Sequence, residues 1–112
     1  MDRVYSLLGL AKKAGQLLSG DETCEKAIKS GKAVLVVVAG DASENTKDKF
    51  LSMCRFRNVC YREYGEKLEL GRYTGKEIRA VVSILSKDFK NGLLNLIDDQ
   101  KNESGGEGIG KG

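Results

Sequence analysis

The run Ala33–Ala39 constrains the fold of this chain more than any other segment. It contains four valines, one leucine and two alanines, and it has no polar residue. β-Branched residues favour extended strands, and a strand without polar residues is typical of one that is buried on both faces. We therefore expect this segment to form the centre of a sheet that is covered on both sides.

Helical and extended patterns alternate along the rest of the chain. The spacing of apolar residues predicts helices over residues 2–14, 21–30, 44–56, 66–73 and 87–101. Further extended segments are expected at residues 17–19, 58–61 and 78–85. Strands that alternate with helices around a buried strand predict an α/β fold, in this case a three-layer α/β/α sandwich.

The domain prediction is a single unit over residues 1–102. Residues 103–112 are mostly glycine with charged residues, a composition that predicts a disordered tail. No run of about 18 apolar residues is present, and the first residues lack the basic and then apolar order of a signal peptide. The sequence therefore predicts a cytoplasmic protein with no membrane partner, and a monomer is the default expectation.

Several kinds of chemistry are disfavoured by the residues that the chain lacks. Histidine is absent, which removes the commonest general acid or base near neutral pH. The three cysteines, Cys24, Cys54 and Cys60, form no CxxC pair and lie in apolar patterns, so we expect reduced thiols buried as small hydrophobic groups. We expect no enzyme activity, no cofactor and no metal site.

The turn before the second predicted helix is the first candidate for ligand binding. Helix N-termini bind phosphate through their unpaired amides, but Asp21 and Glu22 would repel the phosphate of a mononucleotide. Ser19 and Glu22 have the spacing of a capping box, which predicts that Ser19 caps this helix.

A polar stripe follows on the same helix. Gly20, Thr23 and Lys26 are three residues apart and share one face, and Lys29 extends the stripe. Glu22 stands beside it and can accept hydrogen bonds from base edges. An ordinary solvated helix face would show the same pattern, so the stripe alone does not distinguish a polyanion-binding surface.

The segment Leu70–Arg79 is the second candidate. It combines a short helix, a glycine turn and the start of a strand, and it carries three cations. Two glycines four residues apart allow a ligand to approach the backbone closely, although a charged connector is an equally simple interpretation. Elsewhere, Lys12 and Lys13 suit the end of a helix, and we expect Arg55, Arg57 and Arg62 only to solvate the surface.

Taken together, these stretches resemble the kink-turn RNA-binding L7Ae/L30e ribosomal-protein superfamily, and within it the short bacterial YlxQ type. The likeness covers about residues 1–98. It is carried by Leu8–Gly15, by Ser19–Gly20 with Lys26–Ala39, and by Leu70–Gly71 with Gly75 before Val81–Ile84.

The resemblance implies a four-stranded mixed sheet inside the sandwich and two RNA-facing elements. These are the start of the second helix and the loop before the last strand. By position, Gly20 corresponds to the glycine whose backbone meets RNA, and Lys26 to the lysine that faces phosphate and base edges. The remaining expected contacts are Lys32 after a glycine turn and the loop residues Gly75, Lys76, Glu77 and Ile78.

The chain departs from the family pattern at two positions in the first element. The strongest kink-turn binders carry Asn and Glu after the glycine and one spacer, which is Asp21 here. Glu22 and Thr23 occupy these two positions, and they lack the amide donor and the carboxylate, respectively, with which sheared G·A pairs are read.

These observations predict a non-catalytic protein that binds structured RNA, either a kink-turn or ribosomal RNA, and that is associated with the ribosome and translation. Two alternatives stay open. One is a protein-interaction adaptor that uses Val59–Tyr64. The other is an accessory subunit that presents RNA to an RNA-modifying enzyme.

Overall fold

The computed structural model describes residues 2–75 and 77–105, with side chains as far as Asp99. In chain order the elements are α1 (Arg3–Lys13), β1 (Leu17–Ser19), α2 (Asp21–Lys29), β2 (Leu35–Val38), α3 (Glu44–Arg57), β3 (Cys60–Glu63), α4 (Lys67–Tyr73), β4 (Val81–Ile84) and α5 (Lys87–Gly105). Each predicted helix and strand is present, and most boundaries lie within a few residues of those expected.

The four strands form one mixed sheet in the order β1-β4-β2-β3. β2 pairs antiparallel with β4 and parallel with β3, while β1 pairs antiparallel with β4. All four residues of β2 are completely buried. The prediction of a central strand covered on both faces is therefore confirmed.

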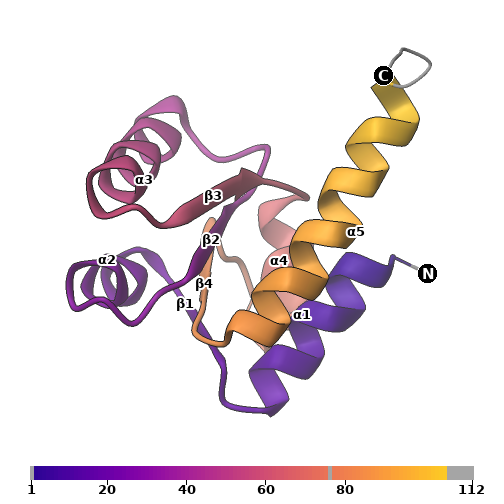
Figure 1. Cartoon of the computed structure of the whole chain (residues 1–112), viewed down its shortest axis with the longest axis horizontal. Helices are drawn as coiled ribbons and strands as arrows, with labels where there is room; N and C mark the ends of the chain where they lie inside the picture. Colours follow the sequence, from indigo (N-terminus) through magenta and orange to yellow (C-terminus); the bar gives the residue numbers. More distant parts are fainter. Residues whose placement is uncertain (1, 76, 106–112) are drawn as a thin grey trace.

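Helices cover both faces of this sheet. α2 and α3 pack against one face, and α1, α4 and α5 form the layer on the other (Figure 1). The fold is thus the expected α/β/α sandwich. This arrangement brings α1 and α4 side by side and leaves α2 on the opposite side of the sheet.

α1 shows how the sequence sets a helix boundary. Oδ1 of Asp2 accepts hydrogen bonds from the amides of Val4 and Tyr5, at 2.8 and 3.2 Å. This satisfies donors that have no partner inside the helix. Val4, Leu8 and Ala11 then face the core and are completely buried.

The expectation that Arg57 and Arg62 only solvate the surface was wrong. Nη1 of Arg57 donates to the backbone carbonyl of Lys29, at the end of α2, at 2.9 Å. Arg62 contacts the helix α5. Its Nε and Nη2 donate to the two carboxylate oxygens of Asp98 on α5, at 2.9 and 3.1 Å. This fork holds the edge strand β3 to a helix far along the chain, and the contact with the carboxylate raises the pKa of the guanidinium.

The described part of the chain ends within the predicted tail, residues 103–112. α5 continues to Gly105, beyond the expected end at residue 101, and residues 106–112 lie outside the described part. Within the described part, no helix combines the length and the apolar character needed to span a membrane.

The three thiols differ in their environment. Cys24 and Cys54 are buried, as predicted, whereas Cys60 is half-buried in the edge strand β3. Burial raises the pKa of Cys24 to about 12 and that of Cys54 to about 11. These two thiols therefore carry almost no thiolate near neutral pH, and the thiolate is the reactive form.

We expect iodoacetamide to alkylate Cys60 of the native protein at pH 8 well before Cys24 and Cys54. Mass spectrometry of tryptic peptides over a time course measures this order. In 6 M guanidinium the three rates should become similar, which controls for local sequence effects. Alkylation of native Cys24 as fast as Cys60 would contradict the burial described here.

Candidate nucleic-acid interface

Gly20 links β1 to α2 and begins the candidate interface. Its φ of 101° and ψ of 150° lie in a region that only glycine adopts readily. Its amide donates to the carbonyl of Val81 at 3.1 Å. The start of α2 is thereby held beside the start of β4.

The predicted capping box is absent. No side chain caps α2, because the Ser19 hydroxyl lies in β1 and accepts a hydrogen bond from Nε of Arg79 at 3.1 Å. The first-turn amides of a helix have no intrahelical acceptor. Those of α2 therefore lack the side-chain acceptor that a capping box would have supplied.

Arg79 joins the two candidate segments. Besides the bond from its Nε to Ser19, its Nη1 donates to the backbone carbonyl of Ile78 at 2.9 Å. Its backbone amide donates to the backbone carbonyl of Lys67, on α4, at 3.0 Å. A Cβ on Gly20 would lie 3.8 Å from its Nε. The loop before β4 and the start of α2 therefore meet at this guanidinium.

Sequence reasoning noted Arg79 only as one of three cations in its loop and did not place it in the site. Its role depends on the register of β1 and β4, which sets Ser19 opposite Val82. No local sequence pattern predicts that register.

The two faces of α2 divide as predicted. Cys24, Ala27 and Ile28 are buried against the sheet. The expected contact residues Asp21, Glu22, Thr23 and Lys26 are exposed. The two carboxylates in the first turn suit the positive end of the helix dipole, and they make this turn a better acceptor of N–H groups than of phosphate.

Lys29 and Lys32 lie away from this start. α2 has nine residues, and at about 1.5 Å per residue it is about 14 Å long. Lys32 follows its C-terminal end, so the length of the helix separates it from Gly20. Nζ of Lys29 is 3.1 Å from Oε2 of Glu25, whose Oε1 is 3.0 Å from Nζ of Lys49.

This arrangement leaves the Lys29 charge partly neutralised. The hydrogen bonds from Lys49 and Lys29 lower the pKa of the Glu25 carboxyl, which therefore stays ionised. Among the predicted residues in and around α2, Gly20, Glu22 and Thr23 therefore lie at the start of the helix, and Lys29 and Lys32 lie at its end.

The loop before β4 presents backbone and an apolar side chain. Gly75 has a φ of 83° and is exposed. Glu77 is exposed as well, and Ile78 is 55% exposed. Lys76, the loop cation that was expected to neutralise phosphate, lies outside the described residues.

Gly71 supports this loop from below. A Cβ at its position would lie 2.7 Å from the amide nitrogen of Ile78 and 2.8 Å from the carbonyl oxygen of Glu77. Gly71 is buried within α4. The loop therefore rests directly on the backbone of α4, and a larger residue would displace it.

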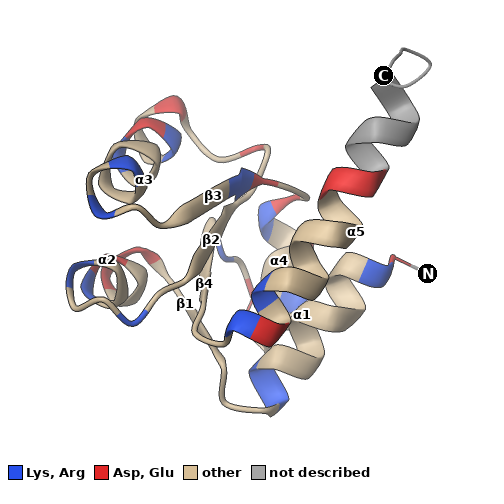
Figure 2. Ribbon diagram, viewed as in Figure 1, with Lys and Arg blue, Asp and Glu red and all other residues tan. Residues whose placement is uncertain are grey.

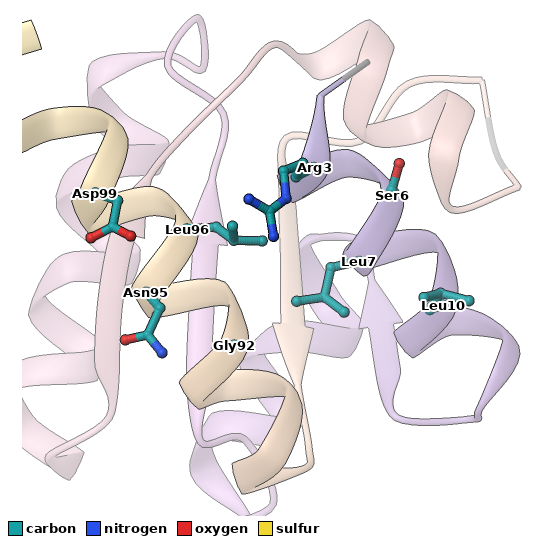
Figure 3. Close-up of a pocket in the computed structure, with 8 residues that line it drawn as sticks. All are labelled: Arg3, Ser6, Leu7, Leu10, Gly92, Asn95, Leu96 and Asp99. Carbon is teal, nitrogen blue, oxygen red and sulfur yellow. The ribbon is translucent and has the colours of Figure 1, made fainter. Parts of the chain in front are cut away.

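Two surface grooves flank α1. The groove toward α5, about 530 Å³, is lined by Arg3, Ser6, Leu7, Leu10, Gly92, Asn95, Leu96 and Asp99 (Figure 3). It carries one cation and one carboxylate on mainly apolar walls. The groove toward α4, about 660 Å³, begins at Gly75 and so adjoins the candidate interface.

Among the residues whose side chains the structure describes, no group of three or more Cys, Asp or Glu side chains is arranged to hold a metal ion.

Comparison with known proteins places this geometry in a wider context. The model of the ribosomal protein L7Ae/L30e/S12e/Gadd45 family matches residues 2–93. The RNA-binding protein YlxQ of Bacillus subtilis is 38% identical over 94 residues, which cover 84% of this chain and 94% of the relative.

Solved structures with a similar fold include two proteins. A protein of unknown function from Bacillus halodurans superposes with a TM-score of 0.84 and 38% identity, covering 88% of this chain and 99% of that one. The Giardia lamblia 15.5kD RNA-binding protein superposes with a TM-score of 0.67 and 26% identity, covering 89% and 84% of the two chains.

Proposed function

Because the chain belongs to the ribosomal protein L7Ae/L30e/S12e/Gadd45 family, we propose that it is a non-catalytic protein that binds structured RNA. The RNA is a kink-turn or a similarly bent segment of ribosomal RNA. In this proposal the protein acts as a monomer in the cytoplasm and is associated with translation. Relatives named as RNA-binding proteins support it.

The observation that carries the proposal is the bridge made by Arg79. Two segments 60 residues apart meet through its hydrogen bond to Ser19. One segment supplies helix-start amides and carboxylates, and the other supplies an exposed loop with Ile78 at its end. An RNA that bends sharply exposes both base edges and backbone, so a two-part surface suits it better than a flat one.

In this proposal the two parts have different roles. Glu22 accepts hydrogen bonds from amino or imino groups of unpaired or sheared bases, and Thr23 donates through its hydroxyl. The exposed face of Ile78 packs against a base or ribose. Lys26 and Lys76 neutralise phosphates, which makes the affinity fall as salt rises.

The departure at Glu22 and Thr23 makes the choice of RNA a sharp test. A binding titration would compare a kink-turn RNA with an unbent duplex of equal length, at 50 and 200 mM salt. We expect tighter binding of the kink-turn at both concentrations. Equal, weak and salt-sensitive binding of the two RNAs would contradict structure-specific recognition and redirect the search to other targets.

We expect Lys26→Ala to weaken kink-turn binding and to reduce the slope of log affinity against log salt by about 1, because one phosphate contact is lost. Its thermal midpoint should change by no more than about 1–2 °C, since Lys26 is exposed and makes no core contact.

The matched control for this variant is Arg55→Ala, which removes one exposed cation from α3. It should bind RNA within twofold of the wild type. A large loss of stability in Lys26→Ala would show that the side chain is structural, and an unchanged affinity would remove it from the interface.

A second candidate function, a protein-interaction adaptor, is favoured by the position of β3. Within the part of the chain that the structure describes, this strand lies at the edge of the sheet and pairs with β2 alone. An exposed edge can accept a strand from a partner. Capture of a specific protein that persists at high salt after nuclease treatment would support the adaptor, whereas loss of all partners with nuclease would oppose it.

A further inference from the structure

The groove between α1 and α4 combines cations with aromatic and apolar side chains. Its walls are Ser6, Gly9, Leu10, Lys12, Lys13, Arg72, Tyr73, Thr74 and Gly75. Three of these nine residues are cations, and none is acidic. We refer to it as the α1–α4 groove.

The cations of the groove are available to a ligand. Lys12 and Lys13 lie in the last turn of α1, where the ribbon is blue in Figure 2. Both residues are exposed. The Arg72 side chain is 63% exposed, and its contact with Glu69 is long, at 3.5 Å. Three cations facing one hollow favour a ligand with several negative charges, such as a chain of phosphates.

An aromatic side chain lies on the same wall. The ring of Tyr73 stacks on that of Tyr5, with centroids 5.1 Å apart and planes 6° apart. Tyr5 packs edge-on against Tyr64, and its hydroxyl accepts a hydrogen bond from the amide of Glu66 at 3.2 Å. Tyr73 is therefore a positioned ring, and it is 36% exposed.

Leu10, 55% exposed, adds apolar surface beside this ring. Cations together with exposed aromatic and apolar side chains are the features by which proteins hold single-stranded nucleic acid, since phosphates meet the cations and unpaired bases stack on the ring.

The groove is continuous with the candidate interface. Gly75 lines the groove and begins the loop that ends at Arg79. Gly71 on the same helix supports that loop. Because Gly75 belongs to both the loop and the groove, an RNA strand that leaves the loop could pass directly into the groove.

From this continuity we infer that the α1–α4 groove binds a single-stranded RNA segment that flanks the structured element. Lys12, Lys13 and Arg72 contact its phosphates, and Tyr73 stacks on one of its bases. The inference rests on the proposed function, because it extends the RNA surface around Gly20 and Arg79.

The experiment uses two forms of one RNA, a kink-turn core and the same core with a six-nucleotide single-stranded extension. Extensions at the 5′ and 3′ ends are made separately. Affinities are measured by fluorescence anisotropy for the wild type, for Lys12→Ala/Lys13→Ala and for Tyr73→Leu.

The matched control is Arg55→Glu, which changes the net charge by two, as Lys12→Ala/Lys13→Ala does. Arg55 is exposed and, like Lys12 and Lys13, lies in the last turn of a helix. It belongs to α3, in the helix layer on the other face of the sheet.

We expect one of the extensions to raise wild-type affinity about tenfold. The Lys12→Ala/Lys13→Ala variant should lose this gain and still bind the core within threefold of the wild type. Its salt slope on the extended RNA should fall by about 1.4, which corresponds to two single-strand phosphates. Tyr73→Leu should lose part of the gain, and the α3 control should keep all of it.

Equal wild-type affinity for the core and for both extended RNAs would overturn the inference while leaving the proposed function intact. Equal loss of the gain in the α3 control would also overturn it, because general charge would then explain the effect. If the core RNA binds no better than an unbent duplex, the proposed function is contradicted. The inference about the groove is tested by a different comparison, that of the extended RNA with the core RNA.

Discussion

The Gly71→Ala variant should unfold at a temperature about 10 °C below the wild type, although alanine is the better helix former. A Cβ at position 71 would lie 2.7 Å from backbone nitrogen of Ile78, and neither backbone can yield without moving the loop. Overpacking of this kind costs about 1–3 kcal/mol. A loss of about 2 kcal/mol corresponds to about 10 °C for a domain of this size.

Gly92→Ala is the matched control, since Gly92 also lies inside a helix, α5. There the added Cβ meets only the Cδ2 end of Leu7, at 3.1 Å, and that side chain can move. The gain in helix propensity of about 1 kcal/mol should then offset the contact, leaving the midpoint near or above that of the wild type.

Differential scanning calorimetry of both variants tests the account. A Gly71→Ala protein as stable as Gly92→Ala would show that the loop does not rest on α4 as described. Residual folded Gly71→Ala protein should also bind kink-turn RNA more weakly, because its loop is displaced.

Replacement of Arg79 by alanine should weaken binding of structured RNA about tenfold or more. The variant loses a cation beside the start of α2, and it also loses the hydrogen bond to Ser19 that holds the two halves of the surface together. One removed charge-assisted hydrogen bond of this kind accounts for about 1.5–3 kcal/mol.

Arg79→Lys separates the two contributions. Lysine keeps the charge but lacks the fork that reaches both the Ser19 hydroxyl and the Ile78 carbonyl. If positioning dominates, the lysine variant should bind almost as weakly as the alanine variant while retaining the wild-type salt slope. Full rescue by lysine would reduce the role of Arg79 to that of a point charge.

The sequence was sufficient to predict the layers of the fold because its central segment allows only one environment. Val36 and Val37 alternate sides of the sheet, yet both are completely buried, so helices had to cover both faces. The helices could be predicted because their apolar residues recur with the helical period.

The failures share a different cause. Local spacing predicts a capping box at Ser19 and Glu22, but the Ser19 hydroxyl bonds to Arg79, which is 60 residues away. The sequence predicts that Arg62 is a surface charge, but its partner Asp98 is 36 residues away. Both errors concern polar side chains whose partners are chosen by strand register and helix docking, which no short motif encodes.

For the candidate site, the sequence predicts which residues are exposed but not which distant residues meet. Exposure of Thr23 and Lys26 follows from the helix period, and the exposed loop at Gly75 follows from its glycine turn. That Arg79 connects them, and that Lys32 is separated by the length of α2, emerge only from the assembled sheet.

The pairing of β1 with β4 also means that the candidate RNA surface is completed late in the synthesis of the chain. A nascent chain that has passed Lys26 already contains the first half of the surface, but the positioning partners Arg79 and Val81 do not yet exist. Folding of α2 alone leaves the start of that helix unanchored. The two-part surface is therefore complete only after β4, the last strand in the sequence, has joined the sheet.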